Sequence, residues 1–169
     1  MVGLAPGLHG ANRTGRPFTG DAAGDLLYPA LIAHGFMHGT FAAHRDDGLH
    51  ASDGRVTNAA RCAPPRNRPT GAEIGSCNRY LADEIQAMPR LAVILALGAV
   101  AHGAVLRALG ERPAQIPFRH GARHDLARLV VIDSYHCSRL NTNTGRLTPA
   151  MFDRVVHIAR AAVAARGYE

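Results

Sequence analysis

The 169-residue sequence contains no lysine, so every one of its 19 basic side chains is an arginine. The chain therefore has no Walker-type phosphate-binding lysine, no pyridoxal Schiff base and no lysine nucleophile. The 13 acidic residues leave a formal net charge of +6, and arginine grips phosphate in a bidentate fork, so the composition suits a polyanionic partner. A genomic preference for arginine over lysine, which the many alanines and glycines support, explains the same count.

The sequence also lacks a long hydrophobic run. The longest, Leu91–Ala101, has 11 residues and includes a glycine, whereas a helix needs about 20 apolar residues to cross a bilayer. No basic and apolar leader follows Met1. We therefore expect a cytoplasmic protein without membrane contact, built as a single domain over residues 1–169 and acting as a monomer. Three cysteines are too few for a disulfide framework.

Short apolar runs alternate with helical patterns along the chain. Runs without polar alternation are typical of strands covered on both faces, and the runs that predict strands are Met1–Ala5, Arg55–Ala60, Leu91–Leu97 and Leu129–Asp133. The predicted helices are Asp21–Phe36, a segment from the capping box Thr70-x-x-Glu73 to about Met88, Ala99–Leu109, and one from Thr148 to just before Gly167. This order predicts an α/β fold with a mostly parallel sheet, whose ligands bind beyond the carboxyl ends of the strands. The polar segments Met37–Asp53 and Arg112–Asp125 are interpreted as surface loops.

The segment after the first strand, Gly3–Asp21, has five glycines in 19 residues, which permits close approach of the backbone to a ligand. Arg13 and Arg16 stand near Asn12 and two threonines, side chains able to hold phosphate oxygens. Phe18 is an aromatic residue in a polar loop, where it either offers a stacking surface to a flat ligand or fills the loop. The glycine pattern fits neither a dinucleotide-binding motif nor a P-loop.

Two further polar segments follow the second and fourth strands. Asn58 lies on the second strand, where a buried carboxamide either pairs with nearby backbone or reads a ligand. Cys62 and Cys77, with 14 residues between them, are either buried apolar side chains or part of an iron–sulfur site that needs two more thiolates. His136 is either a hydrogen-bond donor or general acid, or a cap on strand-end carbonyls. Leu140, an apolar residue between polar neighbours, is typical of a side chain that wedges into DNA.

Three segments of the chain resemble the motifs of the uracil-DNA glycosylase superfamily, most closely those of its type B, or family 5, branch. They are GLAPGLHGANRTGRPFTGD from Gly3, TNAARCAPPRNRPTGAEIGSC from Thr57 and SYHCSRLNTNTGRLT from Ser134, in the family's order over nearly the whole chain. The resemblance implies a three-layer αβα sandwich around a four-stranded, mainly parallel sheet. It also implies a monofunctional DNA glycosylase of base-excision repair that flips uracil, hypoxanthine or xanthine out of DNA and hydrolyses the N-glycosidic bond.

The resemblance implies roles for the residues at matching positions. Phe18 stacks on the flipped base, Asn58 reads its edge, and His136 stabilises charge on the leaving base. Leu140, four residues after that histidine, fills the hole left in the duplex. The residues implied to contact DNA around it are Arg13, Arg16, Ser138, Arg139 and Asn141, and those implied to line the base pocket with Phe18 are Gly3, Ala5 and Asn12.

The chain departs from the family's pattern at three points. Ala5 stands where better-known members carry the carboxylate that activates water, so Asp21 is the candidate base, with Asn12 as an orienter of the water. Cys137 stands where the family usually has proline, which predicts a less rigid loop. Cys62 and Cys77 match two of the four cysteines that hold a 4Fe–4S cluster in the family. The other two belong to a segment before the start of this chain, which we expect it to lack.

The sequence leaves three functions open. An active base-excision glycosylase is favoured by Asp21, Asn58 and His136 together, and the absence of lysine predicts that it has no lyase activity, because β-elimination needs an amine. A lesion-binding DNA module without hydrolysis is favoured by Ala5 and Cys137. A general nucleotide-binding α/β enzyme explains the sheet but not the apolar wedge.

Overall fold

The computed structural model describes residues 1–167, so the last two residues of the predicted domain 1–169 lie outside the described residues. The helices are α1 (Ala11–Thr14), α2 (Gly24–Ala33), α3 (Gly71–Gln86), α4 (Ala99–Ala108), α5 (Arg139–Asn143) and α6 (Pro149–Ala164). The strands are β1 (Val2–Gly3), β2 (Met37–His38), β3 (His50–Ala51), β4 (Thr57–Asn58), β5 (Val93–Leu97), β6 (Arg123–Asp125) and β7 (Val130–Ser134). Two short 3₁₀ helices lie in loops, η1 (Pro65–Asn67) and η2 (Pro113–Gln115).

The central sheet has five strands in the order β4-β1-β5-β7-β6. Strands β4, β1, β5 and β7 are parallel, which confirms the four predicted strands and brings their carboxyl ends to one edge. The regular part of β1 and β4 is short, but the amides of Ala59 and Ala60 continue the ladder by donating to the carbonyls of Gly3 and Leu4, each at 2.9 Å.

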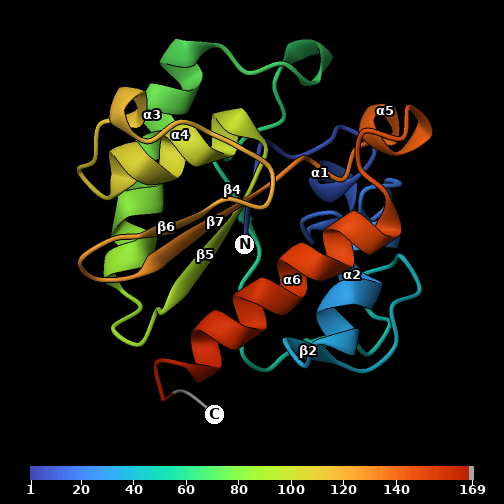
Figure 1. Cartoon of the computed structure of the whole chain (residues 1–169). Helices are drawn as coiled ribbons and strands as arrows, with labels where there is room; N and C mark the ends of the chain where they lie inside the picture. Colours follow the sequence, from blue (N-terminus) through green and yellow to red (C-terminus); the bar gives the residue numbers. More distant parts are fainter. Residues whose placement is uncertain (168–169) are drawn as a thin grey trace.

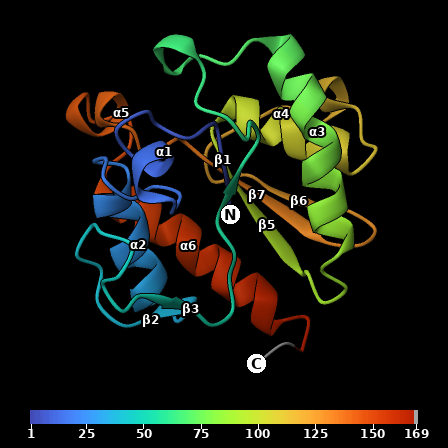
Figure 2. The same ribbon diagram turned by 180° about the vertical axis from the view of Figure 1, so that it is seen from behind.

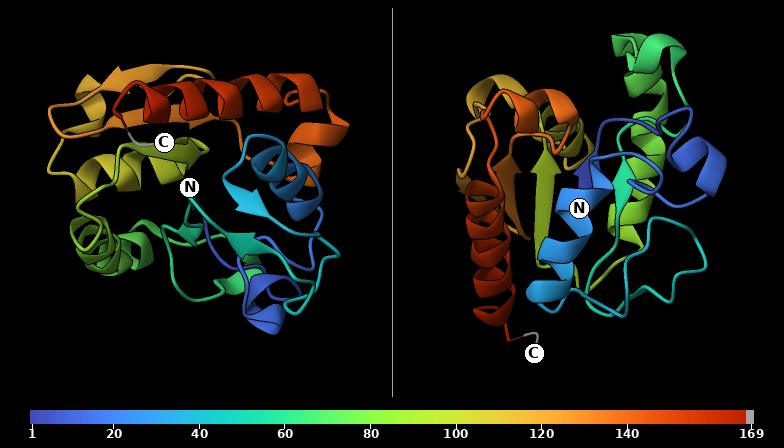
Figure 3. Two further views of the ribbon diagram at one scale, coloured as in Figure 1. Left: turned by 90° about the horizontal axis from the view of Figure 1, so that it is seen from below. Right: turned by 90° about the vertical axis from the view of Figure 1, so that its right-hand side faces the viewer.

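The sheet lies between two helical layers, α3 and α4 on one face and α2 and α6 on the other (Figures 1 and 2), which confirms the predicted αβα sandwich. Side chains alternate along β5: Leu95 and Leu97 pack toward α2 and α6, whereas Ile94 and Ala96 pack toward α3 and α4. The side view in Figure 3 shows α6 on one side of the strands and α3 on the other. Because both faces are covered, the central strands are apolar without alternation.

Strand β6 corrects the expected four-stranded sheet. It lies in the segment Arg112–Asp125, interpreted from the sequence as a loop, and pairs antiparallel with β7 at the edge of the sheet. Its residues, Arg-His-Asp, form no apolar run from which a strand could be predicted. Charged side chains of this kind are common on edge strands. The segment Met37–Asp53 likewise contains an antiparallel pair, β2 with β3, that the sequence did not predict.

The two longest helices begin where the sequence predicts. The Thr70 side chain accepts a hydrogen bond from the Glu73 amide, and the Glu73 carboxylate accepts one from the Thr70 amide, which completes the capping box of α3. The Thr148 hydroxyl accepts from the Met151 amide and caps α6. Within residues 1–167, none of the helices combines the length and the hydropathy of a bilayer-spanning segment.

Candidate active site

The three motif segments meet at the edge of the sheet where the parallel strands end. Gly3 ends β1, Asn58 ends β4, and His136 follows β7 by two residues. The short helices α1 and α5, from the first and last of these segments, lie on the same side of the molecule in Figures 1 and 2. Ligands of parallel α/β sheets bind at this edge.

Gly3, Phe18 and Asn58 are in close contact. A Cβ atom on Gly3 would lie 2.4 Å from Cζ of Phe18 and 2.5 Å from Oδ1 of Asn58, so only glycine fits. Phe18 has a φ of 53°, a left-handed conformation that costs a non-glycine residue about 1–3 kcal/mol. The hydroxyl of Tyr28 donates to the carbonyl of Pro17 and holds this turn. Phe18 is 6% exposed and packs in the core, so it fills the loop, and the tip of its ring also faces Asn58.

The carboxamide oxygen of Asn58 is buried without a hydrogen-bond partner, and it is the one such side-chain atom among the described residues. An unpaired buried polar atom costs about 1–3 kcal/mol, and the backbone pairing considered from the sequence does not occur at this oxygen. A cavity of about 310 Å³ lies beside Asn58 and is also lined by Pro6, Asn12 and Pro17. A larger cavity, of about 550 Å³, lies at the opposite edge of the sheet, by the starts of β1 and β5. The unpaired Oδ1 of Asn58 beside the smaller cavity therefore indicates an acceptor for a hydrogen bond from a ligand.

Replacing Gly3 with alanine is expected to reduce activity at this site by about 10- to 100-fold, because Phe18 and Asn58 must both move and misplacement by about 1 Å costs that much. Overpacking also costs about 1–3 kcal/mol of stability. Single-turnover kinetics and thermal melting measure the two effects. Gly75→Ala is the control, since nothing lies within 4 Å of a Cβ there. Full activity of Gly3→Ala would show that the close contact is not needed.

His136 lies beside Phe18, with ring centroids 5.7 Å apart and planes inclined by 30°. Gly98, at the start of α4, backs it: a Cβ there would lie 3.6 Å from Cβ of His136. Burial lowers the pKa of His136 below its ordinary value, and the negative charge of Asp21 opposes this shift. The imidazole is therefore neutral near pH 7 and able to donate one N–H group.

Asp21 is exposed and ends the first motif segment. Its Oδ1 accepts a hydrogen bond of 3.0 Å from a backbone amide just before α2, and Oδ2 faces Gly10 so closely that a Cβ there would lie 2.5 Å from it. Its negative charge opposes the lowering of the pKa of His136, so the carboxylate lies within electrostatic range of the histidine. Asn12 and Ala5, the other two positions associated with water activation, carry no charge. Asn12 is exposed on α1, and Ala5 is half-buried.

The two arginines of this segment have different surroundings. Arg13 is exposed on α1, where its Nε donates to the carbonyl of His9. Nη1 and Nη2 of Arg16 each lie 2.7 Å from one carboxylate oxygen of Asp47, a side chain with no exposed surface. This pairing holds the pKa of Asp47 well below its usual range. The guanidinium of Arg16 is thus paired with Asp47 and links the Met37–Asp53 segment to the Gly3–Asp21 segment. This differs from the predicted contact with phosphate.

The helix α5 presents Leu140 outward, with 72% of its surface exposed. Arg139 is also exposed, whereas Ser138 and Asn141 are half-buried. The side-chain amide of Asn141 donates to the carbonyl of His136 at 2.8 Å. An apolar side chain and a cation therefore project from a helix that is tied directly to the candidate histidine.

The three cysteines have different environments. Cys62 is exposed, and Cys77, on α3, is half-buried and accepts from the backbone amide of Arg61 at 3.5 Å. Cys137 has no exposed surface, and burial raises its pKa to about 12, so it packs in the core beneath the loop that it was expected to loosen. A 4Fe–4S cluster takes four thiolates. Among residues 1–167 only Cys62 and Cys77 have thiols that reach the surface, so the described residues by themselves do not complete such a site.

A second buried polar group lies outside the motifs. His102 of α4, His124 of β6 and Asp133 of β7 have potential ligand atoms that all lie within 4.8 Å of one another. This donor set is of a kind that binds divalent metals, but the two histidines already bond to the carboxylate, at 2.7 and 2.9 Å. Because the residues come from three separate elements, no local spacing in the sequence signals them.

Comparisons with known proteins agree with the motif resemblance. The family model of the uracil DNA glycosylase superfamily matches residues 1–160. The chain is 46% identical over 161 residues to the type-5 uracil-DNA glycosylase of Thermus thermophilus, covering 95% of this chain and 73% of that protein. The type-5 enzyme of Pyrobaculum aerophilum is 45% identical over 161 residues, covering 95% and 70%. A type-4 uracil-DNA glycosylase of the same organism is 36% identical over 118 residues, covering 69% and 52%.

Proposed function

This chain belongs to the uracil DNA glycosylase superfamily, whose members are hydrolases of N-glycosyl bonds, and we propose that it is a type-5 enzyme that excises uracil from DNA in base-excision repair. The observation that carries the proposal is the unpaired Oδ1 of Asn58, which lies against Gly3 and Phe18 at the ligand-binding edge of the sheet. A base in a duplex cannot reach this buried atom unless it is flipped out of the stack.

The carboxamide of Asn58 suits the Watson–Crick edge of uracil. Uracil presents an N3–H donor beside the O4 acceptor, which the oxygen and the amide group of one Asn side chain complement. Cytosine presents an N3 acceptor beside an amino donor, so its edge would place like groups opposite each other and leave buried polar atoms unpaired. Asn58 therefore selects the deaminated base over the normal one.

The same reasoning extends the substrate range to deaminated purines. Hypoxanthine and xanthine each present a ring N–H donor beside a carbonyl oxygen, the pattern that uracil presents to Asn58. Adenine lacks this ring N–H, so the pairing separates hypoxanthine from adenine; guanine carries the same N1–H and O6, so the pairing does not separate xanthine from guanine. We propose that hypoxanthine and xanthine are also excised, each through the same pairing with Asn58.

The chemistry of excision falls to Asp21 and His136. The carboxylate of Asp21 takes a proton from a water molecule as the water oxygen bonds to C1′ of the deoxyribose and the C1′–N bond breaks. The electron pair of that bond leaves with the base, and the neutral imidazole of His136 donates its N–H to the base oxygen on which negative charge gathers. Protonation of the base then gives the free base and an abasic sugar.

The excision rate is expected to show no inflection near pH 6.5, the ordinary pKa of histidine, because burial lowers the pKa of His136. The neutral form therefore persists below pH 6.5, and activity falls only when the pH drops through the lowered pKa. There the imidazolium would attract Asp21 and compromise it as a base. A single-turnover pH–rate profile measures this. An inflection at or above pH 6.5 that disappears in His136→Gln would contradict the neutral role.

The helix α5 carries the groups suited to hold the flipped state. Leu140 enters the space that the extruded base vacates, because an exposed apolar side chain gains from stacking between base steps. Arg139 beside it and Arg13 on α1 neutralise phosphates, and Ser138 and Asn141 offer polar groups to the same strand. We propose that these residues, together with Leu140, form the DNA contact surface of a protein that acts as a monomer.

Affinity for duplex DNA is expected to fall steeply with salt, because each arginine–phosphate contact releases counterions. Replacing Arg139 with alanine should lower the slope of log affinity against log salt by about one. Arg128→Ala is the matched control, since this exposed arginine stands two residues before β7 and so lies at the opposite edge of the sheet. Titrations of labelled duplex at several salt concentrations give the slopes. Equal slopes for wild type and Arg139→Ala would remove Arg139 from the interface.

We further propose that Cys62 and Cys77 are the two thiolates that this chain contributes to a 4Fe–4S cluster. The amide of Arg61 supports this, since its hydrogen bond to Sγ of Cys77 holds the residue directly before Cys62 against α3. No step of the excision chemistry uses the cluster. Anaerobic reconstitution with an added dithiol that supplies the two missing thiolates, followed by iron and sulfide assays, should give bound iron that is lost in Cys77→Ser. Equal iron content in the two proteins would exclude the assignment.

The experiment that tests the proposed function is release of free base from duplexes that contain one uracil, hypoxanthine or xanthine. Alkaline cleavage of the products reports abasic sites, and no cleavage is expected without alkali because the chain has no lysine for β-elimination. Asn58→Ala should lose activity on all three bases. Tight binding to the lesions without base release would instead indicate a lesion-binding module, the alternative favoured by Ala5 and Cys137.

A further inference from the structure

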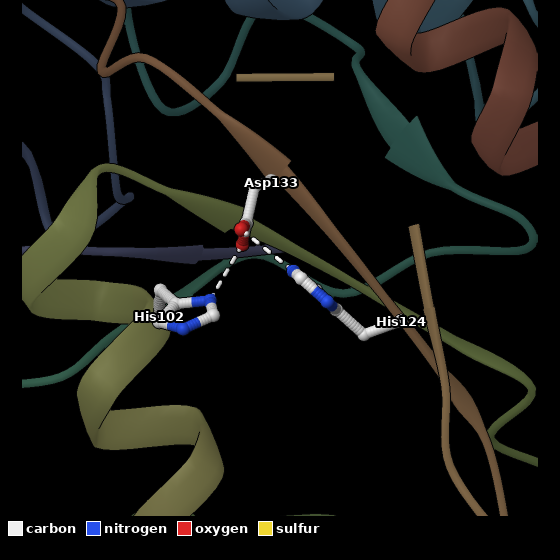
Figure 4. Close-up of side chains that lie close together, drawn as sticks. All are labelled: His102, His124 and Asp133. Atoms are coloured by element: carbon white, nitrogen blue, oxygen red, sulfur yellow. Dashed lines mark hydrogen bonds and ion pairs between the residues drawn. The ribbon is translucent and has the colours of Figure 1, made fainter. Parts of the chain in front are cut away.

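A buried carboxylate on β7 joins three elements outside the proposed pocket. Asp133 has no exposed surface, and its Oδ1 lies 2.7 Å from Nδ1 of His102. Its Oδ2 lies 2.9 Å from Nε2 of His124 and accepts from the backbone amide of Arg119 at 3.2 Å. Figure 4 shows both rings directed at the carboxylate. The other ring nitrogen of His102 lies 2.8 Å from the carbonyl of Ile116, so the segment between Ile116 and His124 is fixed to both α4 and β7.

His120 lies in the middle of that fixed segment and contacts Tyr135. The two rings are stacked, with centroids 4.7 Å apart and planes inclined by only 7°. Nδ1 of His120 also accepts a hydrogen bond of 3.1 Å from the backbone amide of Tyr135. A ring nitrogen that accepts is unprotonated, and burial lowers the pKa of His120, which favours this neutral form. The guanidinium of Arg146 lies 4.5 Å from the Tyr135 ring.

Tyr135 is the residue directly before His136, in a stretch that belongs to neither β7 nor α5. Its amide is held by the His120 ring, and the carbonyl of His136 is held by the side chain of Asn141. The backbone that presents the candidate catalytic histidine is thus fixed at both ends by side chains rather than by regular secondary structure. Misplacement of a catalytic group by about 1 Å can cost 100-fold in rate.

We propose that His120 is a positioning residue for His136: by accepting from the Tyr135 amide, it fixes the peptide from which the His136 ring reaches the leaving base. This inference rests on the proposed function, because the position of His136 affects rate only if His136 acts on the base. Asp133, with His102 and His124, holds in place the segment that carries His120.

Two substitutions separate the two contacts that His120 makes. His120→Asn places a carboxamide oxygen near the position of Nδ1 and keeps the acceptor but loses the stacked ring. His120→Phe keeps a ring on Tyr135 but has no acceptor. We expect the single-turnover rate of uracil excision to fall about tenfold in His120→Phe, since the half-buried Tyr135 amide loses its partner, and to stay within about threefold of wild type in His120→Asn. DNA affinity should not change in either.

A double-mutant cycle with His136→Ala tests whether the effect passes through His136. In that background His120→Phe should cause no further loss, because the residue that it positions is absent. Multiplicative losses, or a rate that is normal in His120→Phe and reduced in His120→Asn, would overturn the proposal. If His120→Phe fails to fold in a thermal melt, His120→Gln replaces it, because its longer side chain sets the amide at the Nε2 position.

Hydrogen exchange at the Tyr135 amide gives a readout that needs no activity. The amide should be protected in wild type and His120→Asn and should exchange faster in His120→Phe, while amides in β7 keep their protection. Wild-type protein that releases no uracil would refute the proposed function, and the exchange pattern would still decide whether His120 holds the peptide. Equal protection in all three proteins would overturn the inference.

Discussion

Replacing Asp21 with asparagine is expected to slow excision by about 10²–10⁴-fold on every DNA substrate, the range typical for loss of a general base. The carboxamide can still accept the hydrogen bond that Asp21 receives from the Ala23 amide, so the loop before α2 should keep its shape. The substitution affects the hydrolysis of the N-glycosidic bond, which follows flipping. The fold loss in excision rate should therefore be similar for paired, mismatched and single-stranded uracil. Single-turnover rates with enzyme in excess measure the loss, and DNA affinity should change little.

Asp25→Asn is the control for the loss of one negative charge, because Asp25 is an exposed residue in the first turn of α2. It should retain wild-type rates. Full activity of Asp21→Asn would mean that water is activated elsewhere in the site. Asn12, which lines the cavity beside Asn58, would then be the next residue to replace.

Replacing Leu140 with alanine is expected to reduce excision from fully paired duplex by about 100-fold, while single-stranded DNA loses less than about threefold. Flipping a paired base costs a few kcal/mol of stacking and pairing, and a wedge offsets part of that cost. Single-stranded and mismatched substrates need less of this help. The pocket chemistry stays intact, because Leu140 is exposed on α5 and the site histidine is tied to that helix through Asn141.

Leu140→Met is the matched control, since it keeps an apolar side chain of similar reach and should act on paired uracil nearly as well as wild type. Rates on paired, mismatched and single-stranded uracil should be compared in the same salt. A loss in Leu140→Ala that is equal on all three substrates would contradict the wedge. The same substrate pattern in Asp21→Asn and Leu140→Ala would show that the two roles are wrongly assigned.

The layers of the fold and the edge that carries the site could be predicted because both follow from local patterns. The apolar run of β5 requires cover on both faces, and the capping box at Thr70 fixes the start of α3. Once four parallel strands were expected, Asn58 and His136 had to lie at the same edge. The closeness of Asn58 and His136 therefore follows from the order and the direction of the strands.

The features that the sequence missed depend on contacts between distant segments. The strand β6 has only polar and charged residues and forms because β7 offers it a free edge. Arg16 was expected to face DNA, but Asp47, 31 positions away, occupies its guanidinium. The contact of His120 with Tyr135 has no local spacing either. Pairings of this kind are decided by the tertiary structure, so no pattern within one segment reports them.

The central claim is that the unpaired Oδ1 of Asn58 accepts a hydrogen bond from N3–H of the flipped base. Comparing the release of uracil and 3-methyluracil from the same oligonucleotide tests this claim most directly. The methyl group removes the N3–H donor and leaves the rest of the base unchanged, so it deprives Asn58 of its partner. Use of single-stranded DNA for both substrates removes any difference in base pairing. We expect single-turnover release of uracil and a release of 3-methyluracil that is slower by about 100-fold or more, in line with the cost of a lost buried hydrogen bond. Equal rates for the two bases would contradict recognition by Asn58.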